Sequence, residues 1–277
     1  MLELQTILRK YNLESNVAEM GQHFIIDEQV LQRMVYLGDV REYESILEVG
    51  AGYGNLTRRI AERRPQMVYA MEKDERFAHA LREELAPYDN VRILVCDALE
   101  TEWPKAEKLI ANPPYRISEP LIHRIFTHQF SSAILIFPRF LADRLTANPH
   151  DSDYTKLSLM MNSMYDIKIE DTLLPQVFFP RPRVYSALVR LTLRNLVDFE
   201  TYLVRSMFLQ SDKKLKNTLR EALIQYGGDT NKRLTKRESR KLVAELTLDQ
   251  SILEMYIPQI PLEELQRIIR ASENIHF

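Results

Sequence analysis

The chain has 277 residues, of which 45% are hydrophobic and 27% charged, a composition typical of a globular protein and not of a disordered one. Its net charge of −2 gives the whole chain no general affinity for nucleic acid, and its one cysteine excludes a disulfide framework. No apolar run approaches the ~18 residues needed to cross a bilayer, and the first residues do not resemble a signal peptide. We therefore expect a cytoplasmic protein of one large domain or two unequal ones.

From residue 45 to residue 137, short apolar segments alternate with helical patterns. Strands are expected at 45–49, 66–71, 91–95, 108–111 and 133–137, and helices at 55–64, 74–85 and 118–128. The last of these helices begins with Ser118 as its expected N-cap, with proline at the second helical position. This alternation predicts a mostly parallel sheet covered on both faces.

The pattern changes after Asp166. Two strands, at 166–172 and 184–193, have no long helix between them, so we expect an antiparallel pair at one end of the sheet. From residue 198 the pattern is helical, with helices expected at 198–210, 215–226 and 262–272, and a further one opened by a capping box at Thr235. Gly227-Gly228 is expected to end the second of them. We place the boundary near Leu196, between a sheet domain (1–196) and a helical domain (197–277).

Charge is concentrated in the helical part. Between Arg205 and Lys241 there are eleven basic and four acidic residues, so the rest of the chain is acidic. Such a block can attract a polyanion, although solvated helix faces are the common alternative. The candidate RNA contacts in this block are Lys213, Lys214, Lys216, Arg220 and Arg237.

A glycine-rich turn, Glu48-Val49-Gly50-Ala51-Gly52-Tyr53-Gly54, follows the first strand and leads into a helix. Glycines let the backbone turn sharply and approach a ligand closely. The spacing G-x-G-x-G differs from the G-x-G-x-x-G of dinucleotide-binding folds, which argues against a nicotinamide-dependent dehydrogenase. Glu48 before the turn suits the ammonium group of S-adenosylmethionine better than a diphosphate. A plain structural turn is the alternative reading.

Acidic residues also end the next two strands. Glu72 could accept hydrogen bonds from two ribose hydroxyls, and Asp97 could accept one from an adenine amino group. Each alone is an ordinary residue of a strand end. Because open α/β sheets bind ligands at the carboxyl ends of their strands, Glu48, Glu72 and Asp97 together predict a nucleoside-binding pocket.

The segment Asn112-Pro113-Pro114-Tyr115 follows the strand at 108–111. The Asn112 side-chain oxygen and the Pro113 carbonyl can both accept hydrogen bonds from one exocyclic amino group, and the Tyr115 ring can stack on a base. No general base is needed, because a sulfonium methyl group is already activated. The six histidines are scattered, and we expect no metal.

Several motifs resemble those of the KsgA family of ribosomal RNA small-subunit adenine dimethyltransferases, a branch of the Rossmann-like class I methyltransferases. Besides the glycine turn and Asn112–Tyr115, they are Gly21-Gln22-His23-Phe24-Ile25, Asp97-Ala98-Leu99 and Phe178-Phe179-Pro180-Arg181-Pro182-Arg183-Val184-Tyr185-Ser186-Ala187. The resemblance runs from Gly21 to Leu193 and is weaker in the helical tail.

The resemblance implies S-adenosylmethionine as cofactor and N6 of two adjacent adenosines near the 3′ end of small-subunit rRNA as acceptors, with a role in subunit maturation. It implies that Tyr115 and Phe178 hold the extruded base. It also implies that the cofactor pocket is formed by Gln22, Phe24, Glu48, Gly50, Gly52, Glu72, Asp97 and Asn112. We expect a monomer.

The chain departs from the family in several places. Tyr185 stands where the family has Asp. On the side expected to face RNA, Pro138-Arg139-Phe140 stands where the family typically has Gln-Lys-Glu, and Thr155-Lys156 where it has Gly-Arg. The changes in these two segments leave open the exact RNA target and whether one or two methyl groups are added. Two alternatives also remain open: a non-catalytic ribosome-assembly factor on the same fold, and an adenine methyltransferase of another nucleic acid.

Overall fold

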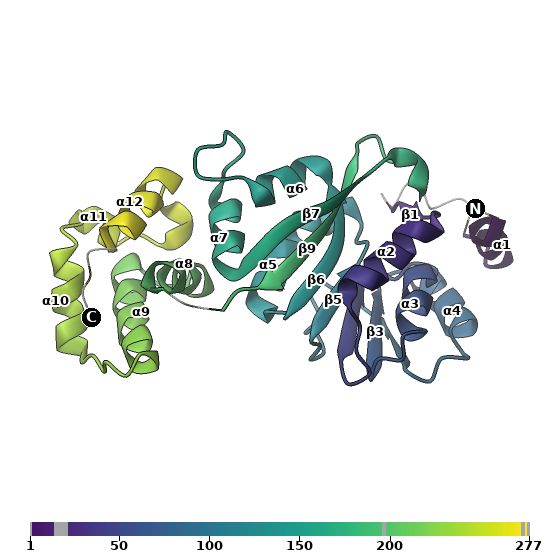
Figure 1. The fold of residues 1–277 in the computed structure, drawn as a ribbon, viewed down its shortest axis with the longest axis horizontal. Helices are drawn as coiled ribbons and strands as arrows, with labels where there is room; N and C mark the ends of the chain where they lie inside the picture. Colours follow the sequence, from purple (N-terminus) through teal and green to yellow (C-terminus); the bar gives the residue numbers. More distant parts are fainter. Residues whose placement is uncertain (1, 14–21, 196–197, 273–274, 276–277) are drawn as a thin grey trace. The chain divides into compact units, whose positions relative to one another are not determined.

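The computed structural model describes residues 2–13, 22–195, 198–272 and 275, which form two compact units (Figure 1). The first contains Met1–Thr146 and Asp166–Leu193, and the second contains Ala147–Tyr165 and Arg194–Phe277. Gly21 of the first motif and Leu196 at the expected boundary lie outside the described residues. Of the helices within these ranges, none has the length and hydropathy needed to cross a bilayer.

The first unit is built on a seven-stranded sheet of order β4-β3-β2-β5-β6-β9-β7. Its strands are β2 (Ser45–Val49), β3 (Met67–Glu72), β4 (Val91–Val95), β5 (Lys108–Ala111), β6 (Ser132–Pro138), β7 (Tyr165–Leu173) and β9 (Ser186–Leu193). The strands from β4 to β6 pair in parallel, whereas β9 pairs antiparallel with β6 and has β7 as its other neighbour. The expected mostly parallel sheet with antiparallel pairing at one end is confirmed.

Helices of the first unit are α1 (Leu2–Lys10), α2 (Glu28–Gly38), α3 (Asn55–Ala61), α4 (Glu75–Glu84), α5 (Ser118–His128) and α6 (Arg139–Thr146). Helix α2 crosses the near face of the sheet in Figure 1, and its apolar side packs against the buried sheet residues Ile46, Ile110 and Ile134. The expected N-cap of α5 is wrong. A 3₁₀ turn (Tyr115–Ile117) leads directly into this helix, so Ile117 takes the cap position and the Ser118 hydroxyl is buried.

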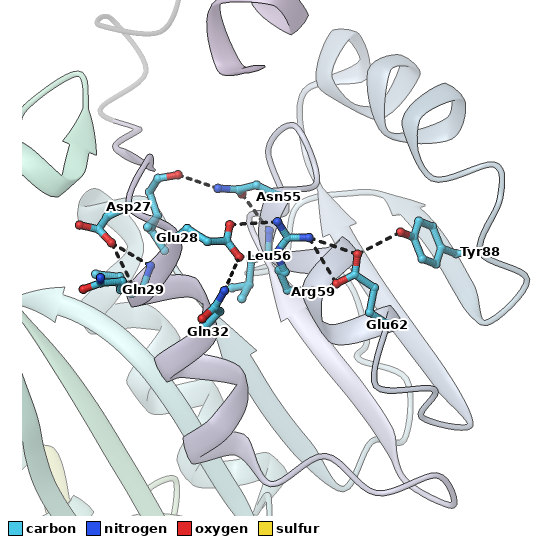
Figure 2. A network of polar contacts seen from close by, with 11 residues as sticks. Asp27, Glu28, Gln29, Gln32, Asn55, Leu56, Arg59, Glu62 and Tyr88 are labelled. Atoms are coloured by element: carbon cyan, nitrogen blue, oxygen red, sulfur yellow. Dashed lines mark hydrogen bonds and ion pairs between the residues drawn. The ribbon is translucent and has the colours of Figure 1, made fainter. Parts of the chain in front are cut away.

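The start of α3, directly after the glycine turn, is attached to a second, two-stranded sheet of β1 (Phe24–Ile25) and β8 (Phe178–Phe179). The Asn55 side-chain amide donates to the Ile25 carbonyl at 2.7 Å, and its oxygen accepts from Leu56 N at 2.9 Å. Figure 2 shows this contact beside the ion pair of Arg59 with Glu28, whose closest N···O distance is 2.7 Å. The glycine turn and the Phe178 segment are thus joined through β1.

The second unit is helical and comprises α7 (Lys156–Met164), α8 (Phe199–Leu209), α9 (Leu215–Asp229), α10 (Lys236–Glu245), α11 (Gln250–Leu253) and α12 (Leu262–Ser272). Its core includes Leu203, Leu219 and Ile268. Helix α7, which the sequence division assigns to the sheet domain, packs with α8, where the Arg205 guanidinium donates to the Ser163 carbonyl at 3.0 Å. The division after residue 196 itself stays a prediction.

The expected end of α9 at Tyr226 is wrong, because the helix continues through both glycines to Asp229. Neither Gly227 nor Gly228 has a positive φ. A Cβ atom at Gly227 would lie 2.5 Å from the Lys232 carbonyl oxygen. The Lys232 N–H in turn donates a hydrogen bond to the Gly227 carbonyl. Gly227 therefore allows the following loop to pack closely on the helix and does not terminate it. The capping box predicted at Thr235 is confirmed.

Candidate cofactor and acceptor site

The site lies where the neighbouring parallel strands β2 and β5 both end. Leu47 pairs with Leu109, so the glycine turn after β2 and Asn112 after β5 meet at one edge of the sheet. Gly50 has a φ of +76°, and a Cβ atom there would lie 2.9 Å from Pro114 Cδ. Only glycine combines this backbone conformation with so close an approach.

A cavity of about 450 Å³, within the usual size of small-molecule sites, opens at this edge. It is lined by Gly50, Glu72, Asp97 and others, including Lys73, Cys96 and Arg116. Glu72 is buried, and its two carboxylate oxygens accept from the N–H groups of Gly52 and Asp74 at 2.8 and 2.9 Å. Burial raises the pKa of Glu72, whereas the hydrogen bond from Lys73 lowers that of Asp97. Of the three expected acids, Glu72 and Asp97 line this cavity and Glu48 does not.

A small cavity of about 20 Å³, enough for one water-sized group, adjoins the larger one, and Gln22, Gly50 and Pro114 line both. Three buried acceptor oxygens of its lining have no hydrogen-bond partner among the described residues: Gln22 Oε1, Glu48 Oε2 and Asn112 Oδ1. Buried polar atoms are normally satisfied, so this lining fits a ligand that brings N–H donors. An amino acid ammonium group is such a ligand.

Glu48 is the most perturbed acid of the site. Burial raises its pKa to about 8, the neighbouring charge of Glu72 adds to this effect, and a hydrogen bond with the Thr57 side chain opposes it. The carboxyl group is therefore mostly protonated at neutral pH in the free protein. A cation placed beside it would favour the ionised form.

The geometry around Asn112 leaves its oxygen available. Its side-chain nitrogen donates to the His23 carbonyl at 2.8 Å, which fixes the amide plane. The Tyr115 hydroxyl forms a short hydrogen bond with the Ser186 hydroxyl, and its ring centroid lies 5.0 Å from that of His23. The Pro113 backbone, which is buried beside Gly50, completes the motif.

Two expected site aromatics are packed against other apolar side chains. Phe178 is 1% exposed and packs in the core, in strand register with Ile25, so in this conformation its ring is not available to a base. Phe24 lines the small cavity but stacks against Tyr53 and Phe77, and a Cβ atom at Gly52 would lie 2.6 Å from its ring. Phe24 therefore supports the glycine turn from behind.

The chain matches the family described as ribosomal RNA adenine dimethylase over residues 14–256. The probable ribosomal RNA small subunit methyltransferase A of Methanothermobacter thermautotrophicus is 37% identical over 222 residues, which cover 79% of this chain and 80% of that one. The protein of the same description from Methanosphaera stadtmanae is 30% identical, over 98% of this chain and 100% of that one. The chain belongs to the ribosomal RNA adenine dimethylase family.

The family confirms the expected enzyme: an S-adenosylmethionine-dependent methyltransferase that acts on adenine N6 of ribosomal RNA. Solved structures confirm the Rossmann-like fold. The dimethyladenosine transferase of Plasmodium falciparum has a TM-score of 0.62 and 22% identity, over 91% of this chain and 98% of that one. The 23S rRNA methyltransferase ErmE has a TM-score of 0.59 and 21% identity, over 91% and 100%.

The structure changes the interpretation of the basic block of this dimethylase. Lys213 is ion-paired with Glu221, and Lys214 and Lys216 both with Glu254, which lies outside the sequence window in which the charges were counted. Arg220 reaches Asn217 at 3.4 Å. Of the five candidate contacts, Arg237 is exposed and has no ion pair within the described ranges. The excess of positive charge is therefore smaller at these lysines than the sequence count suggests.

His23 is a site residue to which the sequence assigned no role. Its Nδ1–H donates to the Pro180 carbonyl at 2.7 Å, its own carbonyl accepts from Asn112, and its ring lies against Tyr115. The position beside Gln22 in the first motif was a signal, but its partners are 89 and 157 residues away. His23 thus links the Asn112–Tyr115 motif to the segment that contains Pro180.

We expect binding of S-adenosylhomocysteine, which carries the same ammonium group as the cofactor, to release about one proton at pH 7, because the cation lowers the pKa of Glu48 from about 8. Isothermal titration calorimetry in buffers of different ionisation enthalpy measures this release. Glu48→Gln, which cannot titrate, should bind without it. If the apparent binding enthalpy of the wild-type enzyme does not change with the ionisation enthalpy of the buffer, no proton is released and this role of Glu48 is contradicted.

We expect His23→Ala to lower kcat ~10- to 100-fold, because the segment loses its hydrogen bond to the Pro180 carbonyl and Tyr115 loses the ring packed against it, with little change in cofactor affinity. His23→Asn places an amide N–H near the position of Nδ1 and should restore most of the activity. Single-turnover methylation and calorimetry separate the two effects. Equal activities of His23→Ala and the wild type, or a His23→Asn variant as slow as His23→Ala, would contradict this assignment.

Proposed function

We propose that the protein transfers methyl groups from S-adenosylmethionine to N6 of two adjacent adenosines near the 3′ end of small-subunit rRNA. One observation carries the proposal. Glu48 Oε2 and Asn112 Oδ1, two buried oxygens without a hydrogen-bond partner in the described residues, belong to the lining of the same small cavity, and this cavity adjoins a larger one of about 450 Å³. The small-subunit target is supported by the names of its curated relatives.

In this proposal the residues of the site bind and orient, and none acts as a base. Gln22 and Glu48 hold the ammonium end of the cofactor, and Glu72 and Asp97 hold its ribose and adenine. The bound cofactor supplies an activated methyl group. Asn112 Oδ1 and the Pro113 carbonyl accept hydrogen bonds from the two N–H groups of the target amine, so that the nitrogen lone pair points at the methyl group. The proton that N6 loses passes to water.

In the second methylation, the monomethylated N6 has one N–H group left to donate to these two oxygens. The base must therefore rebind or reorient in the site before the second transfer. Tyr115 stacks on the extruded base. For Phe178 to contact it from the other side, the ring has to leave the core position that it occupies beside Ile25.

We further propose that the enzyme acts as a monomer in the cytoplasm and takes part in small-subunit maturation. One chain contains every group assigned to the cofactor, so the proposed site requires no residue of a second copy. The complete Asn112–Tyr115 motif argues against a purely non-catalytic assembly factor.

The test of this proposal is a comparison of acceptors. Purified enzyme and labelled S-adenosylmethionine are incubated separately with small subunits that lack the two modifications, with modified small subunits and with large subunits. Label should enter the unmodified small subunits alone. Label in the large subunits, or equal label in the modified small subunits, would contradict the assigned target.

We expect Asn112→Ala to lower the methylation rate at saturating substrates by ~10²- to 10³-fold, because the target amine loses an acceptor that aligns its lone pair. Calorimetry with S-adenosylhomocysteine should show little change in affinity. If the variant instead loses cofactor binding and transfers normally per bound cofactor, Asn112 is a cofactor ligand and not an acceptor of the target amine.

We propose that cations around α10 contact RNA phosphates more strongly than the paired lysines do. Neutralising Arg233, Lys236 and Arg237 to Gln, all exposed and without an ion pair in the described chain, should reduce the salt dependence of RNA binding by up to ~2 in log–log slope. Neutralising Lys213, Lys214 and Lys216 removes the same charge and should reduce it less. A larger loss of salt dependence in the Lys213, Lys214 and Lys216 variant would show instead that these lysines make the phosphate contacts.

A further inference from the structure

Two large aromatic side chains are exposed on two segments whose backbones are hydrogen-bonded to each other. Phe140 and Tyr185 are 59% and 54% exposed. Strand register pairs Pro138 of β6 with Ser186 of β9, and the Arg139 N–H donates to the Tyr185 carbonyl at 2.9 Å. Single exposed apolar residues are ordinary, but Phe140, the second residue of α6, and Tyr185, directly before β9, lie on segments joined by this hydrogen bond. Two large exposed rings this close along the backbone form an apolar surface that a partner can cover. We call this pair the aromatic platform.

The platform adjoins the acceptor site along the chain. Ser186, the residue after Tyr185, forms the hydrogen bond that holds the Tyr115 hydroxyl. Ser186 is fully buried at the start of β9, so the strand that follows Tyr185 also positions Tyr115. A polynucleotide that places one base on Tyr115 has its next nucleotides within reach of this surface.

The charges around the platform suit a polyanion. Arg181 and Arg183, four and two residues before Tyr185, are exposed and have no ion pair in the described residues. Arg139 differs, because it is bound to Asp143 and Thr172 and fixes the start of α6 below Phe140.

We propose that Phe140 and Tyr185 stack on unpaired bases that flank the target adenosines, while Arg181 and Arg183 contact the adjoining phosphates. Aromatic rings interspersed with arginines are the means by which proteins bind single-stranded nucleic acid, since every base offers a π-face. The platform makes the enzyme selective for adenosines in an unpaired loop. The inference rests on the proposed function, because it assumes RNA as the occupant of the neighbouring acceptor site.

The first test measures kinetics on unmodified small subunits. The double variant Phe140→Ala/Tyr185→Ala should raise the KM for RNA ~10-fold or more, with kcat and affinity for S-adenosylhomocysteine unchanged. Phe140→Trp/Tyr185→Phe keeps both π-faces and should retain the wild-type KM. The matched control is Tyr43→Ala, which removes a ring that is 76% exposed in the loop before β2, at the opposite end of that strand from the glycine turn.

The second test identifies the bases. An RNA hairpin with the two adjacent adenosines is made with single abasic sites at each flanking loop position, and binding is measured by fluorescence anisotropy. An abasic site under the platform should weaken binding to the wild type ~10-fold and leave binding to the double alanine variant unchanged. If the wild type does not bind the hairpin alone, the KM comparison on subunits decides.

Three results would overturn the platform. One is a KM of the double alanine variant equal to that of Tyr43→Ala. Another is an abasic penalty that is the same in the wild type and the variant. The third is normal hairpin binding by the variant with weakened binding to assembled subunits, which would make the occupant a ribosomal protein. Failure of the wild type to methylate any small subunit is a different result and would overturn the proposed function instead.

Discussion

The parallel pairing of β2 with β5 determines where every group of the site lies. It brings the glycine turn so close to Pro114 that a Cβ atom at Gly50 would lie 2.9 Å from Pro114 Cδ, and the cofactor end of one strand and the acceptor motif of the other form a single lining. At the far end of these strands Lys108 fixes the register through a buried ion pair with Glu44 at 2.8 Å and a hydrogen bond to the Asp39 carbonyl. A slip of this pair by one residue would turn Ile110 away from the core and separate the two motifs.

Without a ligand, the lining contains buried polar atoms that have no hydrogen-bond partner among the described residues. Buried acceptors without donors cost about 1–3 kcal/mol each, and the site keeps Gln22, Glu48 and Asn112 in this condition in neighbouring positions. Desolvation keeps Glu48 protonated, whereas Asp97 at the exposed side stays ionised against Lys73. Cofactor binding therefore supplies hydrogen-bond donors and a positive charge that the described lining lacks.

Local chemistry made much of this predictable from the sequence. The G-x-G-x-G turn, the acids at strand ends and the alternation of strand and helix all depend on residues that are close in the chain. The errors came from distant partners. Gly227 is needed by the later loop that contains Lys232, and the lysines around Lys214 are neutralised by Glu254. The role of His23 depends on Pro180, which no pattern of spacing connects to it.

The central claim is that one sheet edge places an activated methyl group and the acceptor oxygen of Asn112 on the same adenine nitrogen. The most direct test is to follow methylation of unmodified small subunits in a time course and to identify the labelled nucleosides and RNase fragments by mass spectrometry. The account predicts N6-methyladenosine as a transient species and N6,N6-dimethyladenosine as the product, both confined to two adjacent loop adenosines. Methyl groups on a ring nitrogen, on ribose or on a paired adenosine would contradict it.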